Sequence, residues 1–294
     1  MGPQLVEIQV KTVLNRVCGM GFSWSINPYR GCAHGCPFCY ARRTHWYLDE
    51  DGVGQWSRKI FVKVNAPQVL RAELARPSWK RELVAVGTAT DPYQPAEARY
   101  RITRRILEAL VECRTPASLV TRSPLVLRDV DVLQDLARKA GVTVCVSLVT
   151  LDPQLARQLE PTVALPHQRL RAIEQLSRAG IRTGVMLAPV LPGLTDQPEN
   201  LEAVVRAAVQ AGAQFLAHNV LHLGEVTRDA FWAFLARCHP HLLPMYQKLY
   251  AGRYAPSSYR RRVALRVAEC TRKVRFRLVS ALQPPPPPHQ LALF

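Results

Sequence analysis

The sequence lacks long apolar runs, a secretory leader and a dense set of cysteines. No stretch reaches about 18 apolar residues without a charge or a proline, so we expect no membrane-spanning helix. The first residues, MGPQLVEIQVK, have no basic stretch followed by an apolar one, and we therefore expect no signal peptide. Eight cysteines in 294 residues are too few for a disulfide framework. These absences predict a protein of the reducing cytoplasm.

Acidic side chains are also scarce. There are 22 Asp and Glu against 39 Lys and Arg, which gives a formal net charge of +17. Such an excess favours an anionic partner, with nucleic acid as the first candidate. The alternative is compositional, because the chain is also rich in Ala, Leu, Val and Pro, a mix that genome base composition alone can produce.

From residue 82 onward, short β-branched apolar runs alternate with amphipathic helical stretches. Such alternation predicts a parallel sheet with helices outside it. Gly follows three of the helical stretches, where a helix commonly stops. Strands are predicted at 22–27, 82–90, 117–122, 142–150, 181–189 and 214–223, and helices at 99–113, 128–140, 166–179 and 198–211. Six strands are fewer than the eight of a closed TIM barrel, so a partial barrel and a doubly wound sheet both fit.

The chain divides into four predicted segments. Residues 1–21 are an N-terminal decoration, and 22–224 form the α/β core. Residues 225–280 form a helical basic segment, and 281–294 hold a polyproline linker and the sequence QLALF. The basic segment, with Glu269 as its one acid after residue 258, offers an anion-binding surface or a solvated face; its cations are Arg260, Arg261, Arg262, Arg266, Arg272, Lys273, Arg275 and Arg277.

Three cysteines are crowded into the sequence NPYRGCAHGCPFCYAR, at Cys32, Cys36 and Cys39. The spacing CxxxCxxC on a glycine-containing loop can hold one face of a [4Fe–4S] cluster and leave one iron without a protein ligand. Zinc is the rival, with His34 completing a Cys₃His site. However, His34 lies between the first two cysteines, and the sequence has no second half of a zinc motif. Buried core cysteines alone would not explain the spacing.

This motif, which follows a first strand and has an aromatic residue just before the last cysteine, resembles that of the radical S-adenosylmethionine (SAM) superfamily. The resemblance implies a partial (β/α)₆ barrel with SAM and a [4Fe–4S] cluster as cofactors. In such enzymes SAM chelates the open iron, and its reductive cleavage yields a 5′-deoxyadenosyl radical that abstracts hydrogen from a substrate. An electron donor such as flavodoxin or ferredoxin is implied as a partner.

Further segments resemble the spore photoproduct lyase-like branch of this superfamily, often labelled DNA repair photolyase. They are GTATDPYQPAE at 87–97, TRS at 121–123, LEP at 159–161 and APVLPG at 188–193. The branch implies a lyase or repair activity on DNA. Carried over by resemblance, the SAM-binding positions are Phe38 (through its backbone), Thr90, Arg122, Ser147 and Ala188. All but Phe38 lie at or near strand ends on the functional face of such barrels. Without the resemblance, Thr90 and Ser147 are ordinary strand hydroxyls.

The catalytic positions depart from those of the lyase. The resemblance implies a hydrogen relay of one Cys and two Tyr, but here only Tyr40 matches, and Phe38 and Thr88 occupy the other positions. A threonine O–H is a far poorer hydrogen-atom donor than a thiol, so the lyase relay is largely missing. Cys145, on the same strand face as Ser147, is an alternative donor or a buried structural cysteine.

Two further groups of residues, one polar and one aromatic, each have two interpretations. The run Asp91, Tyr93, Gln94 and Glu97 is either a substrate-facing loop or a helix cap with a solvated Glu97. The aromatic residues at 45–47 either stack on a base or cover the open edge of the barrel.

The C-terminal residues resemble a short motif that binds the bacterial DNA sliding clamp. Prolines 284–288 predict a stiff spacer of roughly 15 Å. Beyond it, Gln290, Leu291, Leu293 and Phe294 would contact the clamp. The alternative is a tail that folds back or stays disordered.

Three functions therefore compete. The first is a radical SAM enzyme that acts on a DNA lesion, and the second is one that modifies RNA, a peptide or a small metabolite. The third is a nucleic-acid- or clamp-binding adaptor with a structural cluster.

Overall fold

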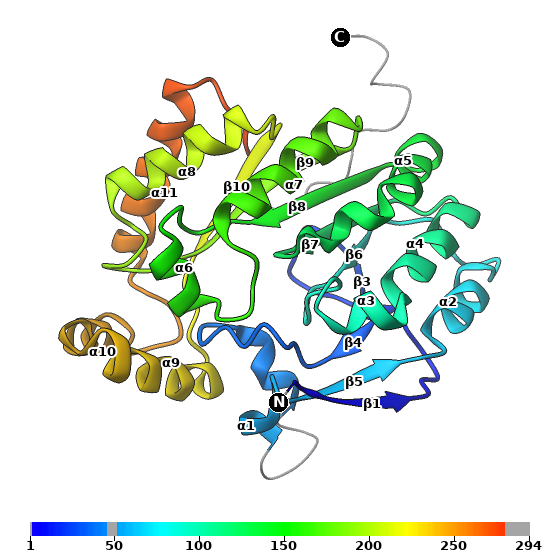
Figure 1. Ribbon diagram of the computed structural model, residues 1–294, viewed down its shortest axis with the longest axis horizontal. Coiled ribbons are helices and arrows are strands. Elements are labelled where there is room, and N and C mark those ends of the chain that lie inside the picture. The colour runs from blue at the N-terminus through cyan, green and yellow to red at the C-terminus, as the bar shows by residue number, and fades with distance from the viewer. Residues whose placement is uncertain (1, 46–51, 280–294) are drawn as a thin grey trace.

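The computed structural model describes residues 2–45 and 52–279 (Figure 1). Its centre is an eight-stranded sheet with the order β11-β10-β9-β8-β7-β6-β3-β2, and all neighbours are parallel except β2 and β3. The strands are β2 (Asn15–Arg16), β3 (Trp24–Ile26), β6 (Val84–Val86), β7 (Ala117–Thr121), β8 (Val142–Ser147), β9 (Arg182–Val190), β10 (Phe215–Val220) and β11 (Leu278–Val279). Within the described residues the edges β2 and β11 do not pair, so the sheet is an open, partial barrel, as predicted.

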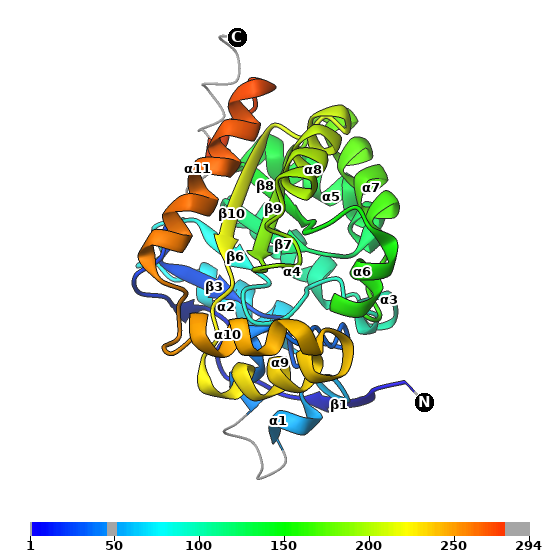
Figure 2. The same cartoon turned by 90° about the vertical axis from the view of Figure 1, so that its left-hand side faces the viewer.

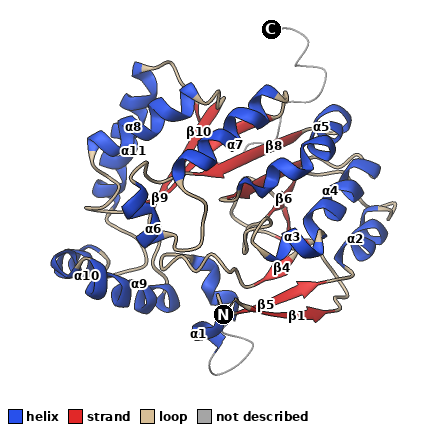
Figure 3. Ribbon diagram, viewed as in Figure 1, coloured by secondary structure: helices blue, strands red, loops and turns tan. Residues whose placement is uncertain are grey.

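The connecting helices lie outside the strands (Figure 3). They are α2 (Ala66–Leu74), α3 (Ala96–Tyr100), α4 (Ile102–Glu112), α5 (Val130–Lys139), α6 (Pro153–Leu159), α7 (Pro166–Arg178) and α8 (Pro198–Gln210). Gly141, Gly180 and Gly212 adopt positive φ directly after α5, α7 and α8, which confirms the predicted helix ends. Because helices cover its outer face and side chains fill the barrel, every residue of β8 is buried.

Side chains on the inner face of the barrel form a small core of their own. Cys145, Phe215, Ala217 and Val279 pack together there, while the outward-facing strand residues join the larger core under the helices. Gly184 leaves room for this packing, since a Cβ on it would lie 2.4 Å from the Phe215 ring. The inner face is therefore closed by apolar contacts away from the strand ends that carry the cysteine loop.

A second, three-stranded sheet was not predicted. It has the order β1-β5-β4, with β1 (Gln4–Ile8) parallel to β5 (Lys59–Lys63) and β4 (Tyr29–Arg30) antiparallel to it. The short helix α1 (Gly52–Gln55) precedes β5. This sheet brings segments on both sides of the cysteine loop together and so anchors the loop at its two ends.

The C-terminal part contains α9 (Glu225–Cys238), η3 (Pro240–Leu242), α10 (Leu243–Leu249) and α11 (Ser257–Lys273). The last helix of this segment ends at Lys273. After Arg275, at φ 52°, the chain forms β11, which pairs with Leu216 and Ala217 of β10. The segment thus covers the sheet edge, with α11 running back alongside β10 (Figure 2). In the described part of the chain, no helix is long and apolar enough to cross a membrane.

Candidate active site

The three clustered cysteines lie on the loop between β4 and the 3₁₀ helix η1 (Tyr40–His45). Cys32 and Cys36 are buried, Cys39 is half-buried, and all three thiols are free. They interact electrostatically with one another. Burial raises the pKa of Cys32 to about 12 and raises the pKa of Cys36 well above its usual range, although Arg122 opposes the rise at Cys36. Thiols buried in this way become thiolates when a positively charged group, such as a metal cluster, binds them.

The backbone of the loop requires glycine at its first turn. Gly31 has φ +86°, and a Cβ there would lie 2.8 Å from the carbonyl oxygen of Lys59 and 2.9 Å from that of Trp56. Only glycine adopts such a conformation without strain and allows this approach. The loop therefore lies in close contact with the start of β5, and this contact positions Cys32.

Two side chains that follow β6 hold the loop from the other side. The Thr90 hydroxyl donates to the carbonyl oxygen of Gly31 at 2.6 Å. Gln94 donates to the same carbonyl at 3.1 Å and accepts from the backbone N–H of Ala33 at 3.0 Å. Thr90, predicted to contact SAM, therefore orients the cysteine loop.

Asp91 joins the loop to the end of β7. Its carboxylate accepts hydrogen bonds from the Thr121 hydroxyl and the Arg122 backbone N–H, both at 2.7 Å. Nε2 of His34 lies 3.2 Å from Oδ2 of the same carboxylate. Burial alone would raise the pKa of Asp91, but His34 and these hydrogen bonds lower it to about 2. His34 therefore faces Asp91, and in the described part of the chain no three His, Cys, Asp or Glu side chains form a single-ion site.

The polar run at 91–97 is largely buried, so the interpretation of Glu97 as solvated is wrong, while Asp91 accepts a hydrogen bond from the backbone N–H of Tyr93 at 2.9 Å. Tyr93, Gln94 and Glu97 are wholly buried. Glu97 pairs with Arg128 at 2.8 Å and accepts the hydroxyl hydrogen of Tyr29. These buried side chains stabilise the polypeptide around the site.

Arg122 extends from the end of β7 into a buried ion-pair network. Its Nε lies 2.7 Å from Oε1 of Glu160, whose other oxygen lies 2.5 Å from Arg169. The Arg122 guanidinium carbon is 5.9 Å from the centroid of the Phe38 ring, and a terminal nitrogen lies 3.5 Å from the carbonyl oxygen of Ala188. The structure thus brings three of the predicted SAM positions together. The sequence reasoning noted Glu160 only as part of a motif and missed its pairing.

Ser147, at the end of β8, has a buried hydroxyl without a hydrogen-bond partner among the described residues. Its backbone is held by Arg169, which donates to the Ser147 carbonyl at 3.1 Å. Unpaired buried hydroxyls are uncommon, so this one is a candidate ligand-binding atom.

The two predicted catalytic residues also lie together. The hydroxyl of Tyr40 donates to the carbonyl oxygen of Thr88, and about half of the Tyr40 side chain is exposed. The Thr88 hydroxyl accepts a hydrogen bond from Asn27 at 3.2 Å. Cys145, the alternative donor, is wholly buried in the inner apolar core.

His45 does not offer a surface for base stacking. It is 1% exposed, and its Nε2 lies 3.2 Å from the carbonyl oxygen of Lys59. It therefore packs beneath the cysteine loop. Residues 46 and 47, predicted with it, lie outside the described residues.

The fold and the cysteine loop define a class of protein, and comparison with known families agrees. The sequence profile of the radical SAM superfamily matches residues 26–206, and the chain belongs to this superfamily. An uncharacterized protein of Mycobacterium tuberculosis is 42% identical over 98% of this chain and 85% of its own length. A radical SAM Nalpha-GlyT isomerase of Pseudomonas phage M6 is 30% identical over 58% of this chain and 34% of its own length.

Two solved structures share the fold. A spore photoproduct lyase variant with bound AdoMet and dinucleoside spore photoproduct has a TM-score of 0.71 and 14% identity, over 92% of this chain and 79% of that one. Streptococcus suis SuiB bound to S-adenosylmethionine has a TM-score of 0.54 and 13% identity, over 95% of this chain and 50% of that one.

The cofactors of this superfamily are a [4Fe–4S] cluster and SAM, and the site fits them. Three buried thiols without disulfide partners offer the soft ligands that iron–sulfur clusters require. The cationic Arg122 and the unpaired Ser147 hydroxyl lie at neighbouring strand ends and suit a ligand with a carboxylate and hydroxyl groups. Bound together, the two cofactors supply reductive cleavage of SAM to a carbon-centred radical.

Proposed function

We propose that the protein is a radical SAM enzyme that acts on DNA, with a lyase-like or repair activity on a modified base. The observation that carries the proposal is the cysteine loop beside Arg122, with the unpaired buried hydroxyl of Ser147 on the neighbouring strand. The net charge of +17 supports a polyanionic substrate, and the likeness of the fold to spore photoproduct lyase supports DNA in particular. In this proposal the barrel of residues 22–224 carries the chemistry, and the segment 225–280 contacts DNA.

In the proposed site, Cys32, Cys36 and Cys39 hold the cluster. Arg122, Ser147, Ala188 and the backbone of Phe38 contact SAM. Thr90 acts indirectly, because its hydrogen bond keeps the Gly31 carbonyl in place and so positions the cysteine loop. The closed apolar core behind these residues excludes water from the reacting atoms.

Tyr40 and Thr88 lie where the substrate would approach, and their chemistry argues against spore photoproduct as the preferred lesion. Thr88 offers a hydroxyl already hydrogen-bonded to Asn27, in place of a thiol. We expect slow turnover or side products on spore-photoproduct DNA. Clean repair over many turnovers, at a rate unchanged by Tyr40→Phe, would contradict this assignment of roles.

The substrate class is tested with the cluster reconstituted without oxygen. SAM and dithionite are added, and 5′-deoxyadenosine is measured with lesion-bearing DNA, undamaged DNA, transfer RNA and peptide pools. Stimulation above the substrate-free rate by lesion-bearing DNA alone is the expected result. Stimulation by RNA or peptides but not by DNA would replace the proposed substrate.

We also propose that the C-terminal sequence binds a DNA sliding clamp. Gln290, Leu291, Leu293 and Phe294 lie outside the described residues, so the sequence resemblance alone supports this. A short extended peptide would bind with modest affinity, because docking removes its conformational freedom. Calorimetry with the host clamp should show binding that is lost when Leu293 and Phe294 are changed to Ala, while SAM cleavage stays intact. Equal binding by both forms, or none at high micromolar concentration, would refute the motif.

The remaining partner is an electron donor such as flavodoxin or ferredoxin, because cluster chemistry of this kind needs an external electron. The reducing cytoplasm is the proposed compartment, since all eight cysteines are free and three of them must stay reduced to bind iron.

A further inference from the structure

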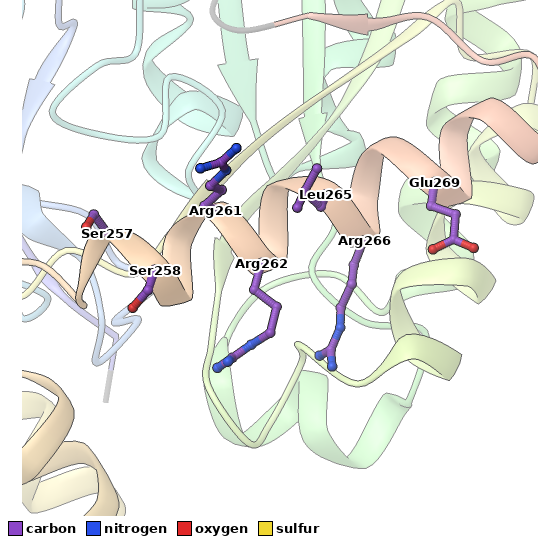
Figure 4. A pocket seen from close by; sticks show the side chains of 7 residues that line it. All are labelled: Ser257, Ser258, Arg261, Arg262, Leu265, Arg266 and Glu269. Atoms are coloured by element: carbon purple, nitrogen blue, oxygen red, sulfur yellow. The ribbon is translucent and has the colours of Figure 1, made fainter.

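One exposed face of α11 carries arginines beside a surface hollow. The hollow has a volume of about 630 Å³ and is lined by Ser257, Ser258, Arg261, Arg262, Leu265, Arg266 and Glu269. Figure 4 shows that Arg262 and Arg266 point to the same side of the helix, while Arg261 points to another side. Leu265 between them is 63% exposed. Arg262 and Arg266 therefore lie on one side of α11 near an accessible apolar side chain, and Arg261 extends from a different side.

Arg261, Arg262 and Arg266 have no carboxylate partners among the described residues. The ion pair of α11 joins Lys273 to Glu269 at 3.9 Å, near the far end of the helix. By contrast, Arg104 on α4 pairs with three carboxylates, those of Glu108, Asp129 and Asp131. Unneutralised like charges on one helix repel one another, so an anionic partner would stabilise this face.

An exposed aromatic ring lies just before this helix. Tyr254 is 59% exposed, and its ring centroid lies 4.6 Å from that of His222. The guanidinium of Arg260, in the first turn of α11, lies 5.6 Å from the Tyr254 ring centroid. Burial, with Arg253 nearby, lowers the pKa of His222, which favours the neutral form of the ring.

This aromatic pair lies at the same end of the barrel as the cysteine loop. His222 follows the C-terminal end of β10 and forms an antiparallel bridge with Tyr254. A few residues further on, the Thr227 hydroxyl lies 3.4 Å from the carbonyl oxygen of Cys39. The helix then runs away from this end, because β11 after it pairs near the start of β10 (Figure 2). A strand bound along α11 would thus be led toward the site.

We propose that Arg253, Tyr254, Arg260, Arg261 and His222 form a rim that binds a nucleic-acid strand and leads it to the barrel mouth. The arginines contact phosphates, because a planar guanidinium matches a phosphate oxygen pair. The Tyr254 ring stacks on an unpaired base, an interaction that tolerates any sequence. This proposal rests on the proposed DNA substrate and names the surface that receives it.

The test is fluorescence anisotropy with the full-length, cluster-loaded protein. The probes are a labelled single-stranded oligonucleotide and its duplex, at about 50 and 200 mM salt. One variant changes Arg253, Arg260 and Arg261 to Ala. Its matched control changes Arg138, Arg178 and Arg206 to Ala, which removes the same charge from α5, α7 and α8, where each arginine is exposed and has an ion-pair partner.

We expect the rim variant to lose about tenfold or more in affinity at low salt. Its salt dependence should fall by about 2 in log–log slope, since each lost contact with a single strand removes about 0.7. The control variant should bind nearly as the wild type does. Equal losses in the rim and control variants would show that only overall charge matters and would overturn the proposal.

The stacking step has its own variant, Tyr254→Leu, which keeps an apolar side chain. It should weaken single-strand binding about fivefold or more, affect the duplex less, and leave the salt slope unchanged. Unchanged binding to the single strand would remove Tyr254 from the rim. Iron content and melting temperature, measured on every variant, verify folding.

The rim and the proposed function fail in different ways. If DNA stimulates 5′-deoxyadenosine release but the rim variant binds DNA as tightly as the wild type, the rim is wrong and the substrate stands. If the rim variant loses binding and no DNA stimulates release, the surface stands and the substrate is wrong. If poly-glutamate displaces the oligonucleotide as well as DNA does, the face is a general anion surface and the proposal is overturned.

Discussion

The barrel mouth and α11 use arginine in opposite ways. At the mouth, Arg122 and Arg169 both form ion pairs with one buried carboxylate, that of Glu160. On α11, Arg261 and Arg266 have no carboxylate partner among the described residues and face the surface. Burying a charge is tolerated only when partners satisfy it, whereas an exposed charge costs little when it has none. The first arrangement suits a small ligand bound in one orientation, and the second suits a polyanion bound in many registers.

Removing the three thiols of the cysteine loop should have the largest effect of the substitutions at the barrel mouth. Replacing Cys32, Cys36 and Cys39 together by Ala should abolish the brown colour and about four irons per chain, because these three residues supply the proposed thiolate ligands. Cys113→Ala and Cys238→Ala are the matched controls and should retain both. Iron and sulfide analysis after anaerobic purification decides the matter. Stoichiometric zinc without visible absorption would end the cluster assignment.

Breaking the buried ion pairs should have the next largest effect. Glu160→Gln leaves Arg122 and Arg169 facing each other without a charge partner, and we expect about 3–5 kcal/mol of lost stability. Glu112→Gln is the control, since Glu112 forms an exposed pair with Arg71 at 2.6 Å and should cost less than about 1 kcal/mol. Urea unfolding of both variants measures the contrast. Equal losses of stability in the two variants would mean that the ion pairs at the barrel mouth stabilise the fold no more than an exposed surface pair does.

Asp91→Asn should have a smaller effect that depends on pH. The folded-state pKa of Asp91 is lowered to about 2, so its stabilisation is complete above the unfolded value of about 3.9 and is lost as pH falls toward 2. We expect the variant to be about 2 kcal/mol less stable at pH 7. Urea unfolding at pH 7, 4 and 3 should show the difference between the two proteins shrinking. A stability difference that stays constant across these pH values would show that the substitution acts through packing and not through the loss of charge.

Ser147→Ala should change stability least. The hydroxyl has no partner among the described residues, so its loss should cost less than about 0.5 kcal/mol, while SAM affinity of the cluster-loaded protein should fall. Thr121→Val is the control, because it removes the 2.7 Å hydrogen bond to Asp91 and should lower stability by about 1 kcal/mol or more. Equilibrium dialysis with SAM measures the affinity. Unchanged affinity would remove Ser147 from the proposed SAM contacts.

Sequence reasoning succeeded where the signal was local. The helix ends were predicted because Gly141, Gly180 and Gly212 follow helical patterns directly, and the cysteine loop was recognised by its spacing. The two-residue strand β11 was missed because its pairing depends on β10, some sixty residues earlier in the chain.

The roles of the polar residues could not be predicted for a similar reason. Asp91 and Glu97 are buried because their partners arrive from other segments, such as Thr121 and Arg128, about thirty residues away. Thr90 lies at a strand end as expected, but its hydroxyl is used by Gly31 in the distant cysteine loop. A local pattern shows that a residue is polar and near a strand end, and only the tertiary contacts show what it binds.

The most direct test of the account is release of 5′-deoxyadenosine by the full-length protein after anaerobic reconstitution. With SAM and dithionite, the wild type should release at least about one equivalent per chain, while the variant with Cys32, Cys36 and Cys39 changed to Ala should release none. The Cys113→Ala and Cys238→Ala variants should match the wild type. A wild-type protein with a full complement of iron that leaves SAM intact would contradict the account.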